Sequence, residues 1–179
     1  IKIMFKKTFF LKKKVIIIIK STIFFEKNDG IFFGFPLFYD FNVINFQNID
    51  QISDQIKGFF LYLGYKNGKL KLINDITGGF RLYKYQIENE LYLSDSYFEL
   101  IAYIRQNKAL EIDSAEFEYW TTHRYTTGSR TFYKHLDKIE PASILLIDKK
   151  AISSAVYFRN IINTPNSISH CKRCYYDWR

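Results

Sequence analysis

Short runs of apolar, β-branched and aromatic residues alternate with turn-forming residues through the first half of the chain. Because this pattern is typical of antiparallel sheets, it predicts strands over residues 15–19, 22–26, 31–35, 59–65, 70–74, 80–86 and 90–94. Three turn signals, Asp29-Gly30, Asn67-Gly68 and Glu88-Asn89, predict hairpins between neighbouring runs. The irregular stretch 39–57 predicts a loop and a short helix near residues 49–56.

The pattern changes near residue 95, where two helix starts with capping signatures appear. Ser96 stands three residues before Glu99, and Asp113 stands three residues before Glu116. Two further strands are predicted at 144–147 and 155–158, with a tail over 160–179. Hairpins followed by helices and then by more strands predict an α+β layered domain.

The same pattern predicts which side chains are buried. Hairpins are not stable alone, so four residues are expected to be buried on central strands: Phe59, Leu61, Leu72 and Leu82. The first helix is expected to face a sheet with Phe98, Ile101, Ala102 and Arg105. On the second helix the corresponding residues are Phe117, Trp120 and Thr121.

The charge of the chain is unevenly distributed. The 179 residues are 47% hydrophobic, enough for one domain with a sizeable core, and the net charge is +8. Seven lysines and no acidic residue lie within the first twenty residues, so the remainder is close to neutral. We interpret residues 1–14 as a solvated, partly frayed basic segment. The alternative is an arm that binds anions.

No segment has the pattern of a membrane span or a signal peptide. The apolar run 15–19 is far shorter than the roughly 20 residues that a spanning helix needs. Lysines at 12–14 interrupt any signal-peptide core, and no small-residue cleavage site follows. We therefore expect a cytoplasmic protein that does not contact a membrane.

Two other groupings of reactive side chains are weak candidates for chemistry. Cys171 and Cys174 form one Cys-x-x-Cys next to His170, whereas a structural zinc ion needs four ligands and a redox pair needs a strand and a helix around it. We interpret them as reduced cysteines in the tail. Asp50 and Asp54 have the spacing of one helix face, and we interpret them as solvated rather than catalytic.

Three ordered segments carry a family resemblance. They are 58–85, which contains N-D-I-T-G-G-F-R-L-Y; 91–101, L-Y-L-S-D-S-Y-F-E-L-I; and 130–148, which contains T-F-Y-K-H-L-D-K-I-E-P-A. Together they resemble the amidotransferase half of the asparagine synthase family, a class II glutamine amidotransferase. The resemblance implies an αββα sandwich of the N-terminal nucleophile (Ntn) hydrolase type, with antiparallel sheets and flanking helices.

The matched residues also have structural reasons to be present. The matched residues are Asn74-Asp75, Gly78, Leu82-Tyr83, Ser94-Asp95, Thr131, Phe132, Leu136, Ile139 and Pro141. Phe80 and Arg81 depart from the family pattern, and Ala142 stands in place of the family's usual glycine. Asp75 can accept backbone N–H bonds across its turn, and Gly78 can take a backbone shape closed to other residues. Pro141 fixes the entry to the next strand. We therefore interpret the matched residues as holding the fold.

The catalytic residues of the active family have no counterparts. Its nucleophile is a cysteine at residue one after Met removal, but Phe5 follows the single methionine, Met4. Where the family has its Asn-Gly oxyanion site, this chain has G-F-P-L-F-Y-D at 34–40. The carboxylate-clamping arginine has no counterpart before Arg81, and the S-G-G-x-D-S loop of the synthetase half does not occur. We therefore predict no catalytic, cofactor-binding or metal-binding residues.

The resemblance thus implies a degenerate glutamine amidotransferase-like domain over residues 15–159 of an asparagine synthase-related protein. Such a pseudoenzyme would lack glutaminase activity and act as a scaffold for an ATP-dependent amide-forming (synthetase) domain or protein. β-Lactam synthetase and lasso-peptide cyclases are similar in keeping the domain without its nucleophile. Two alternatives stay open: an N-terminally incomplete fragment of an active asparagine synthase, and a basic module that binds nucleic acid or anionic lipid.

Overall fold

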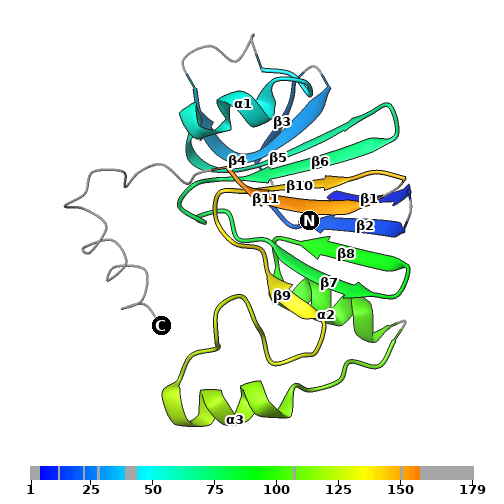
Figure 1. Cartoon of the computed structure of the whole chain (residues 1–179), viewed down its shortest axis with the longest axis vertical. Helices are drawn as coiled ribbons and strands as arrows, with labels where there is room; N and C mark the ends of the chain where they lie inside the picture. Colours follow the sequence, from blue (N-terminus) through cyan, green and yellow to red (C-terminus); the bar gives the residue numbers. More distant parts are fainter. Residues whose placement is uncertain are drawn as a thin grey trace, which may run out of the picture.

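Two β-sheets stacked face to face form the centre of the molecule (Figure 1). The computed structural model describes residues 5–11, 13–21, 23–27, 29–38, 44–106, 108–149 and 151–157. Within these residues, the β2 sheet contains, in spatial order, β1 (Phe5–Phe10), β2 (Lys14–Ile19), β8 (Glu90–Ser94), β7 (Tyr83–Ile87) and β9 (Leu136–Lys138). The β5 sheet contains β11 (Ile152–Val156), β10 (Ser143–Ile147), β6 (Lys69–Asn74), β5 (Lys57–Lys66), β4 (Gly30–Leu37) and β3 (Phe24–Lys27).

Most neighbouring strands are antiparallel, and many are joined by the hairpins that the sequence predicts. Asn67 and Gly68 take φ angles of 51° and 70° in the β5–β6 turn, and Glu88 takes 43° in the β7–β8 turn. The exception is β2, which pairs in parallel with β8 and so joins segments about seventy residues apart. Two sheets rich in antiparallel pairs, together with a few helices, confirm the predicted α+β class.

Helices cover the outer faces of the two sheets. The short helix α1 (Ile49–Ile52), followed by a 3-10 turn, η2 (Ser53–Gln55), packs on the β5 sheet. The helix α2 (Tyr97–Arg105) packs on the β2 sheet. A third helix, α3 (Ser114–His123), lies beyond these layers at the lower end of Figure 1.

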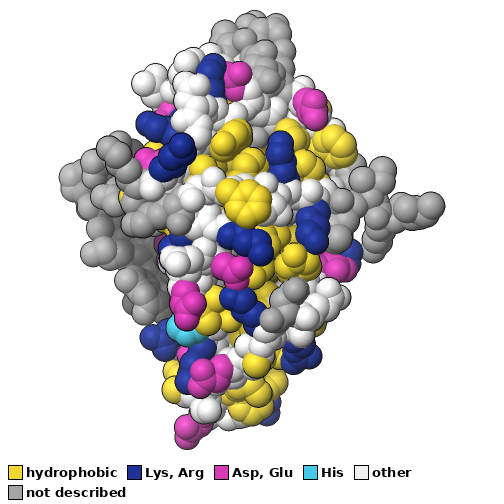
Figure 2. Space-filling model, turned by 90° about the vertical axis from the view of Figure 1, so that its right-hand side faces the viewer, with side chains coloured by type: hydrophobic (Ala, Val, Ile, Leu, Met, Phe, Trp, Pro, Cys, Tyr) yellow, Lys and Arg dark blue, Asp and Glu magenta, His cyan; other side chains and the backbone are white. Residues whose placement is uncertain are grey.

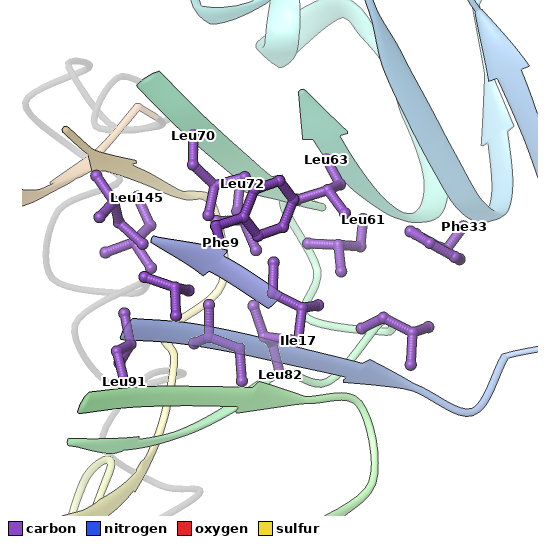
Figure 3. Close-up of a cluster of buried hydrophobic side chains, with 14 of the residues drawn as sticks. Phe9, Ile17, Phe33, Leu61, Leu63, Leu70, Leu72, Leu82, Leu91 and Leu145 are labelled. Carbon is purple, nitrogen blue, oxygen red and sulfur yellow. The ribbon is translucent and has the colours of Figure 1, made fainter. Parts of the chain in front are cut away.

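The main core fills the space between the sheets (Figure 3). Leu61, Leu72 and Leu82 are at most 2% exposed, which confirms three of the four predicted core residues. The prediction for Phe59 is wrong, because its ring is 55% exposed. Phe59 lies near the start of β5 against Gly79, which has no side chain to cover the ring.

The predicted separation of residues 1–14 as a partly frayed end is wrong for Phe5–Phe10. These residues form β1, which pairs along its whole length with β2. Phe9 is 6% exposed in the main core, whereas its neighbour Phe10 is 78% exposed. Phe5–Phe10 is therefore an edge strand with Phe5 and Phe9 on the face that packs against the main core and Phe10 on the opposite face.

The predicted stripe on α2 is correct at Ile101 and wrong at its other three residues, Phe98, Ala102 and Arg105. The buried residues of this helix are Leu100, Ile101 and Ile104, whereas Phe98 is 79% exposed and Ala102 is also exposed. On α3 the predicted stripe of Phe117, Trp120 and Thr121 is wrong too, because Glu116 is its one buried residue. Both helices are apolar on more than one side, so spacing alone did not choose the packed face.

Both predicted helix starts are confirmed by their caps. The Ser96 hydroxyl accepts a hydrogen bond from the Glu99 N–H, and the Asp113 carboxylate accepts one from the Glu116 N–H. Residues 160–179, with their cysteines, lie outside the described part of the chain. None of the described helices is long and apolar enough to cross a membrane.

Candidate binding groove

A tight turn after β6 links two of the three segments that carry the family resemblance. The buried Asp75 carboxylate accepts hydrogen bonds from the backbone N–H groups of Thr77 (3.0 Å), Gly79 (3.0 Å) and Phe80 (2.7 Å). It also accepts one from the Thr77 hydroxyl at 2.6 Å. Asp75 thus closes the turn as the sequence predicts.

The neighbouring Asn74 joins this turn to the segment before β10. Its side-chain oxygen accepts from the Ser143 N–H at 2.7 Å, and its side-chain nitrogen donates to the Glu140 carbonyl at 2.8 Å. The Asp75 carbonyl accepts from the Ala142 N–H at 2.9 Å. Residues almost seventy positions apart are therefore held together by a dense set of hydrogen bonds.

Two residues of this junction have left-handed backbone conformations. Gly78 has φ 69°, and a Cβ atom there would lie 2.7 Å from the Pro141 ring, so glycine is required by both conformation and space. Ala142 has φ 55°, a conformation that favours the glycine found at this position in the resembled family.

The second matched segment is anchored separately. The Asp95 carboxylate, at the end of β8, accepts hydrogen bonds from the backbone N–H groups of Lys20 (2.7 Å) and Ser21 (2.8 Å) just after β2. Burial raises the pKa of this carboxyl, although both hydrogen bonds oppose the rise. Asp95 therefore fixes how the chain leaves β2, a structural role.

Beside the Asp75 turn lies an open groove of about 1150 Å³. One wall comes from the turn and the start of β7, at Gly78, Phe80, Arg81 and Tyr83. The remainder comes from the start of α2, from residues 120–132 after and within α3, and from residues 138–142. Most of the lining thus belongs to the matched segments.

The groove carries two cationic side chains from different segments. Arg81 is exposed before β7, and Lys138 ends β9 with its ammonium group 3.1 Å from the Thr126 hydroxyl. No carboxylate of the described residues lies within 4 Å of either cation. Burial lowers the pKa of Lys138, and the charge of Arg81 lowers it further, while Glu116 opposes this shift.

Aromatic side chains make the groove wall on the side of α3. Trp120 packs edge-on against Phe132, with ring centroids 5.3 Å apart, and Phe98 at the start of α2 is 79% exposed. Beneath α3, the buried Glu116 carboxylate accepts hydrogen bonds from the Thr127 N–H and hydroxyl. Glu116 thereby ties the loop of the groove wall to the helix.

The described groove lining contains few of the side chains that commonly act as nucleophiles or bases. It contains no cysteine, histidine or aspartate, and its one carboxylate belongs to Glu140. The Thr131 hydroxyl donates to the Leu136 carbonyl at 2.6 Å and is not paired with a base. No group of three or more potential metal ligands occurs within the described residues.

The other sequence candidates lie elsewhere. Asp50 of α1 is 3.3 Å from the buried ammonium group of Lys71, whose cation also lies over Phe46. The side chain of Asp54 and the residues His170, Cys171 and Cys174 lie outside the described part of the chain. The expected absence of catalytic and metal-binding residues thus stays a prediction.

The N-terminal lysines do not gather into one site in the described segments. Lys14 is 3.4 Å from Glu90, Lys20 is 2.7 Å from Glu99, and Lys6 lies 4.3 Å above the ring of Tyr103. On the face drawn in Figure 2, basic side chains alternate with acidic and apolar ones. The sequence did not indicate that Arg81 and Lys138 line the same groove. The one signal in the sequence was that Arg81 departs from the family pattern.

Comparison with known proteins adds no relative to this description. No protein-family model matches the chain. No curated protein matches it at a significant level.

Proposed function

We propose that the chain is a degenerate glutamine amidotransferase-like domain of the Ntn-hydrolase type that serves as a scaffold for an ATP-dependent amide-forming domain. The observation that carries the proposal is the role of the matched residues. Asn74, Asp75, Gly78 and Ala142 meet at one junction and are engaged in turn geometry and hydrogen bonds. Such a junction, present without the family's oxyanion site and carboxylate clamp, is expected of a domain that keeps the fold of the family and not its reaction.

Two further observations support the proposal. The order of layers, with α1 and α2 outside two stacked sheets, is compatible with an αββα sandwich. The left-handed backbone at Ala142 explains why a glycine is usual there in the resembled family.

A glutaminase assay on the purified chain tests the inactive part of the proposal. We expect no glutamate release above the rate of a heat-denatured sample, because the residues present offer no counterpart of the oxyanion donors and carboxylate clamp of the active family. Catalytic release of glutamate would contradict the proposal and favour an active asparagine synthase fragment.

The scaffold part requires a partner. Sequencing the gene and its neighbours should reveal a reading frame with an S-G-G-x-D-S loop, whose backbone N–H groups would hold pyrophosphate. Co-expression of that protein with this chain should give a stable complex in which ATP–pyrophosphate exchange depends on the chain. An exchange rate unaffected by the chain would contradict the scaffold role.

A further inference from the structure

The groove beside the Asp75 turn has the chemistry of a ligand site, independently of the proposed scaffold role. We propose that it binds a peptide segment with one carboxylate group flanked by apolar side chains. In this arrangement Arg81 and Lys138 hold the carboxylate, and Phe98 and Trp120 contact the apolar side chains.

The charge of the groove points to an anionic group. Arg81 and Lys138 approach from the start of β7 and the end of β9, and no described carboxylate lies within 4 Å of either cation. Two cations that line one groove without a paired carboxylate repel each other, and a bound carboxylate can relieve this repulsion through strong charge-assisted hydrogen bonds. The buried Glu116 offsets the repulsion at Lys138 only in part. Burial lowers the pKa of Lys138, and the nearby charge of Arg81 lowers it further.

The number of charges favours a single carboxylate over a polyanion. Glu140 also lines the groove, and Glu116 lies buried behind its wall, so a chain of phosphates would meet acidic groups as well as the two cations. Nucleic-acid grooves offer a positive track along the backbone together with stacking rings. Here the rings are present but the positive track is limited to two residues.

The size and lining favour a peptide over a small metabolite. The groove, about 1150 Å³ in volume and open to solvent, is larger than most sites that enclose a drug-sized ligand. Phe98 and Trp120 stand on different helices and line the groove, Phe98 with its ring largely exposed and Trp120 with its ring partly exposed. An extended segment can reach both while its carboxylate lies between the cations.

Fluorescence anisotropy with defined peptides tests the inference. The probe is fluorescein-labelled Leu-Phe-Glu-Phe-Leu with an amidated C-terminus, so that Glu is its one carboxylate apart from the dye. The matched probe replaces Glu by Gln, and a labelled twelve-residue oligothymidylate represents single-stranded nucleic acid. We expect the Glu peptide to bind about tenfold or more tightly than the Gln peptide, as expected for hydrogen bonds to a charged group.

Variants then locate the site. The double variant Arg81→Glu and Lys138→Glu should abolish the preference for the Glu peptide, and Trp120→Ala should weaken both peptides several-fold. Lys69→Glu, at the start of β6 and so at the opposite end of that strand from the Asp75 turn, should change neither affinity. Circular dichroism of each variant checks that the fold is retained.

Three results with the peptides would overturn the inference. The first is equal affinity of the chain for the Glu and Gln peptides. The second is no binding of the Glu peptide at about 1 mM protein, a concentration at which even a very weak interaction would be detected. The third is an unchanged preference for the Glu peptide in the Arg81 and Lys138 double variant. Tighter binding of the oligothymidylate than of the Glu peptide would also overturn it and assign the groove to nucleic acid.

Discussion

At the residue scale, the most consequential side chains are polar groups buried among backbone donors. Asp75 and Asn74 supply acceptors and donors that the turn backbone cannot provide for itself. Buried polar groups stabilise a fold when they are satisfied and cost free energy when they are not. Asp75 is an example of a satisfied buried group, and the Tyr62 hydroxyl is an example of one without a partner among the described residues.

Replacing Asp75 by Ala should lower the free energy of unfolding by about 3 kcal/mol, because it leaves the buried Phe80 N–H and its neighbours without their charged acceptor. Asp75→Asn should cost less, since one side-chain oxygen remains. Urea unfolding followed by circular dichroism measures both. Asp29→Ala is the matched control, because Asp29 forms a partly exposed ion pair with Lys66 that should be worth at most about 1 kcal/mol. Equal losses for Asp75→Ala and Asp29→Ala would contradict the role of the turn.

Tyr62 shows the opposite situation. Its hydroxyl is buried in the α1 side of the β5 sheet without a hydrogen-bond partner among the described residues, and burial raises its pKa. Tyr62→Phe should therefore raise the free energy of unfolding by about 1 kcal/mol. Tyr92→Phe is the control and should lower it by a similar amount, because the Tyr92 hydroxyl donates to Glu90 at 2.8 Å. Thermal unfolding that moves in the same direction for both variants would contradict this assignment.

At the scale of elements, β1 and α3 differ most in how they are held. β1 is paired along its whole length and places Phe9 in the core. By contrast, α3 buries only Glu116 among its residues. The two ends of the segment that contains α3 are instead joined by backbone hydrogen bonds. The Asp113 N–H donates to the Phe132 carbonyl, and the Lys134 N–H donates to the Glu111 carbonyl.

Adjacent residues on β1 provide a direct test of that strand. Phe9→Ala should cost about 3–5 kcal/mol because it empties a core position, and Phe10→Ala should change stability by less than about 0.5 kcal/mol. Chemical denaturation of both variants measures the difference. Similar small losses at both positions would mean that the segment does not pack as an edge strand in solution.

Glu90 joins three elements and should make stability depend on pH. It accepts a hydrogen bond from Lys108, accepts another from Tyr92, and pairs with Lys14 on β2. Hydrogen bonds from Lys108 and Tyr92 lower the pKa of Glu90 from 4.5 to about 2. As the pH falls, Glu90 is therefore protonated in the unfolded chain before it is protonated in the folded chain. Its contribution to the free energy of unfolding is present above the unfolded pKa and is lost as the pH falls from about 4.5 to 2.

The variant Glu90→Gln isolates this contribution. Its melting temperature should depend less steeply on pH than that of the unchanged chain over pH 2 to 5. The quantity to compare is the difference in melting temperature between the two chains at each pH. This is because Asp95 acts in the opposite direction: burial raises its pKa, so its contribution to stability grows as the pH falls. Parallel pH profiles would show that Glu90 is not stabilised as its contacts indicate.

At the scale of the whole molecule, one core between the sheets is flanked by two smaller clusters under α1 and α2. β2, β5 and β6 contribute to the central core and also to a flanking cluster, so the layers share strands. We infer that the sandwich unfolds as one unit while α3, which lies outside it, opens separately.

Native-state hydrogen exchange should resolve these units. Amides of α3 should exchange through local opening, faster than amides at the centres of β5 and β6, whose exchange should require global unfolding. Adding a low concentration of urea should accelerate the strand amides, because global opening exposes much surface, and should affect α3 little. Equal protection of α3 and β5 would contradict the separation.

Much of the secondary structure could be predicted from the sequence because it depends on neighbouring residues. Asn67-Gly68 supplies the backbone conformations of a hairpin turn, and the Ser96 and Asp113 side chains cap amides three residues away. Asp75 likewise bonds to amides within five residues. These interactions are local, so short patterns along the chain contain the needed information.

Only the tertiary structure decided which faces of these elements are buried and where the groove lies. The pairing of β2 with β8, the inward face of α2 and the exposure of Phe59 depend on residues far away in the chain. Arg81 and Lys138 likewise line one groove because β7 and β9 pair, although about fifty residues separate the two strands in the chain. Periodicity describes an element by itself, whereas burial and site geometry depend on which other elements pack against it.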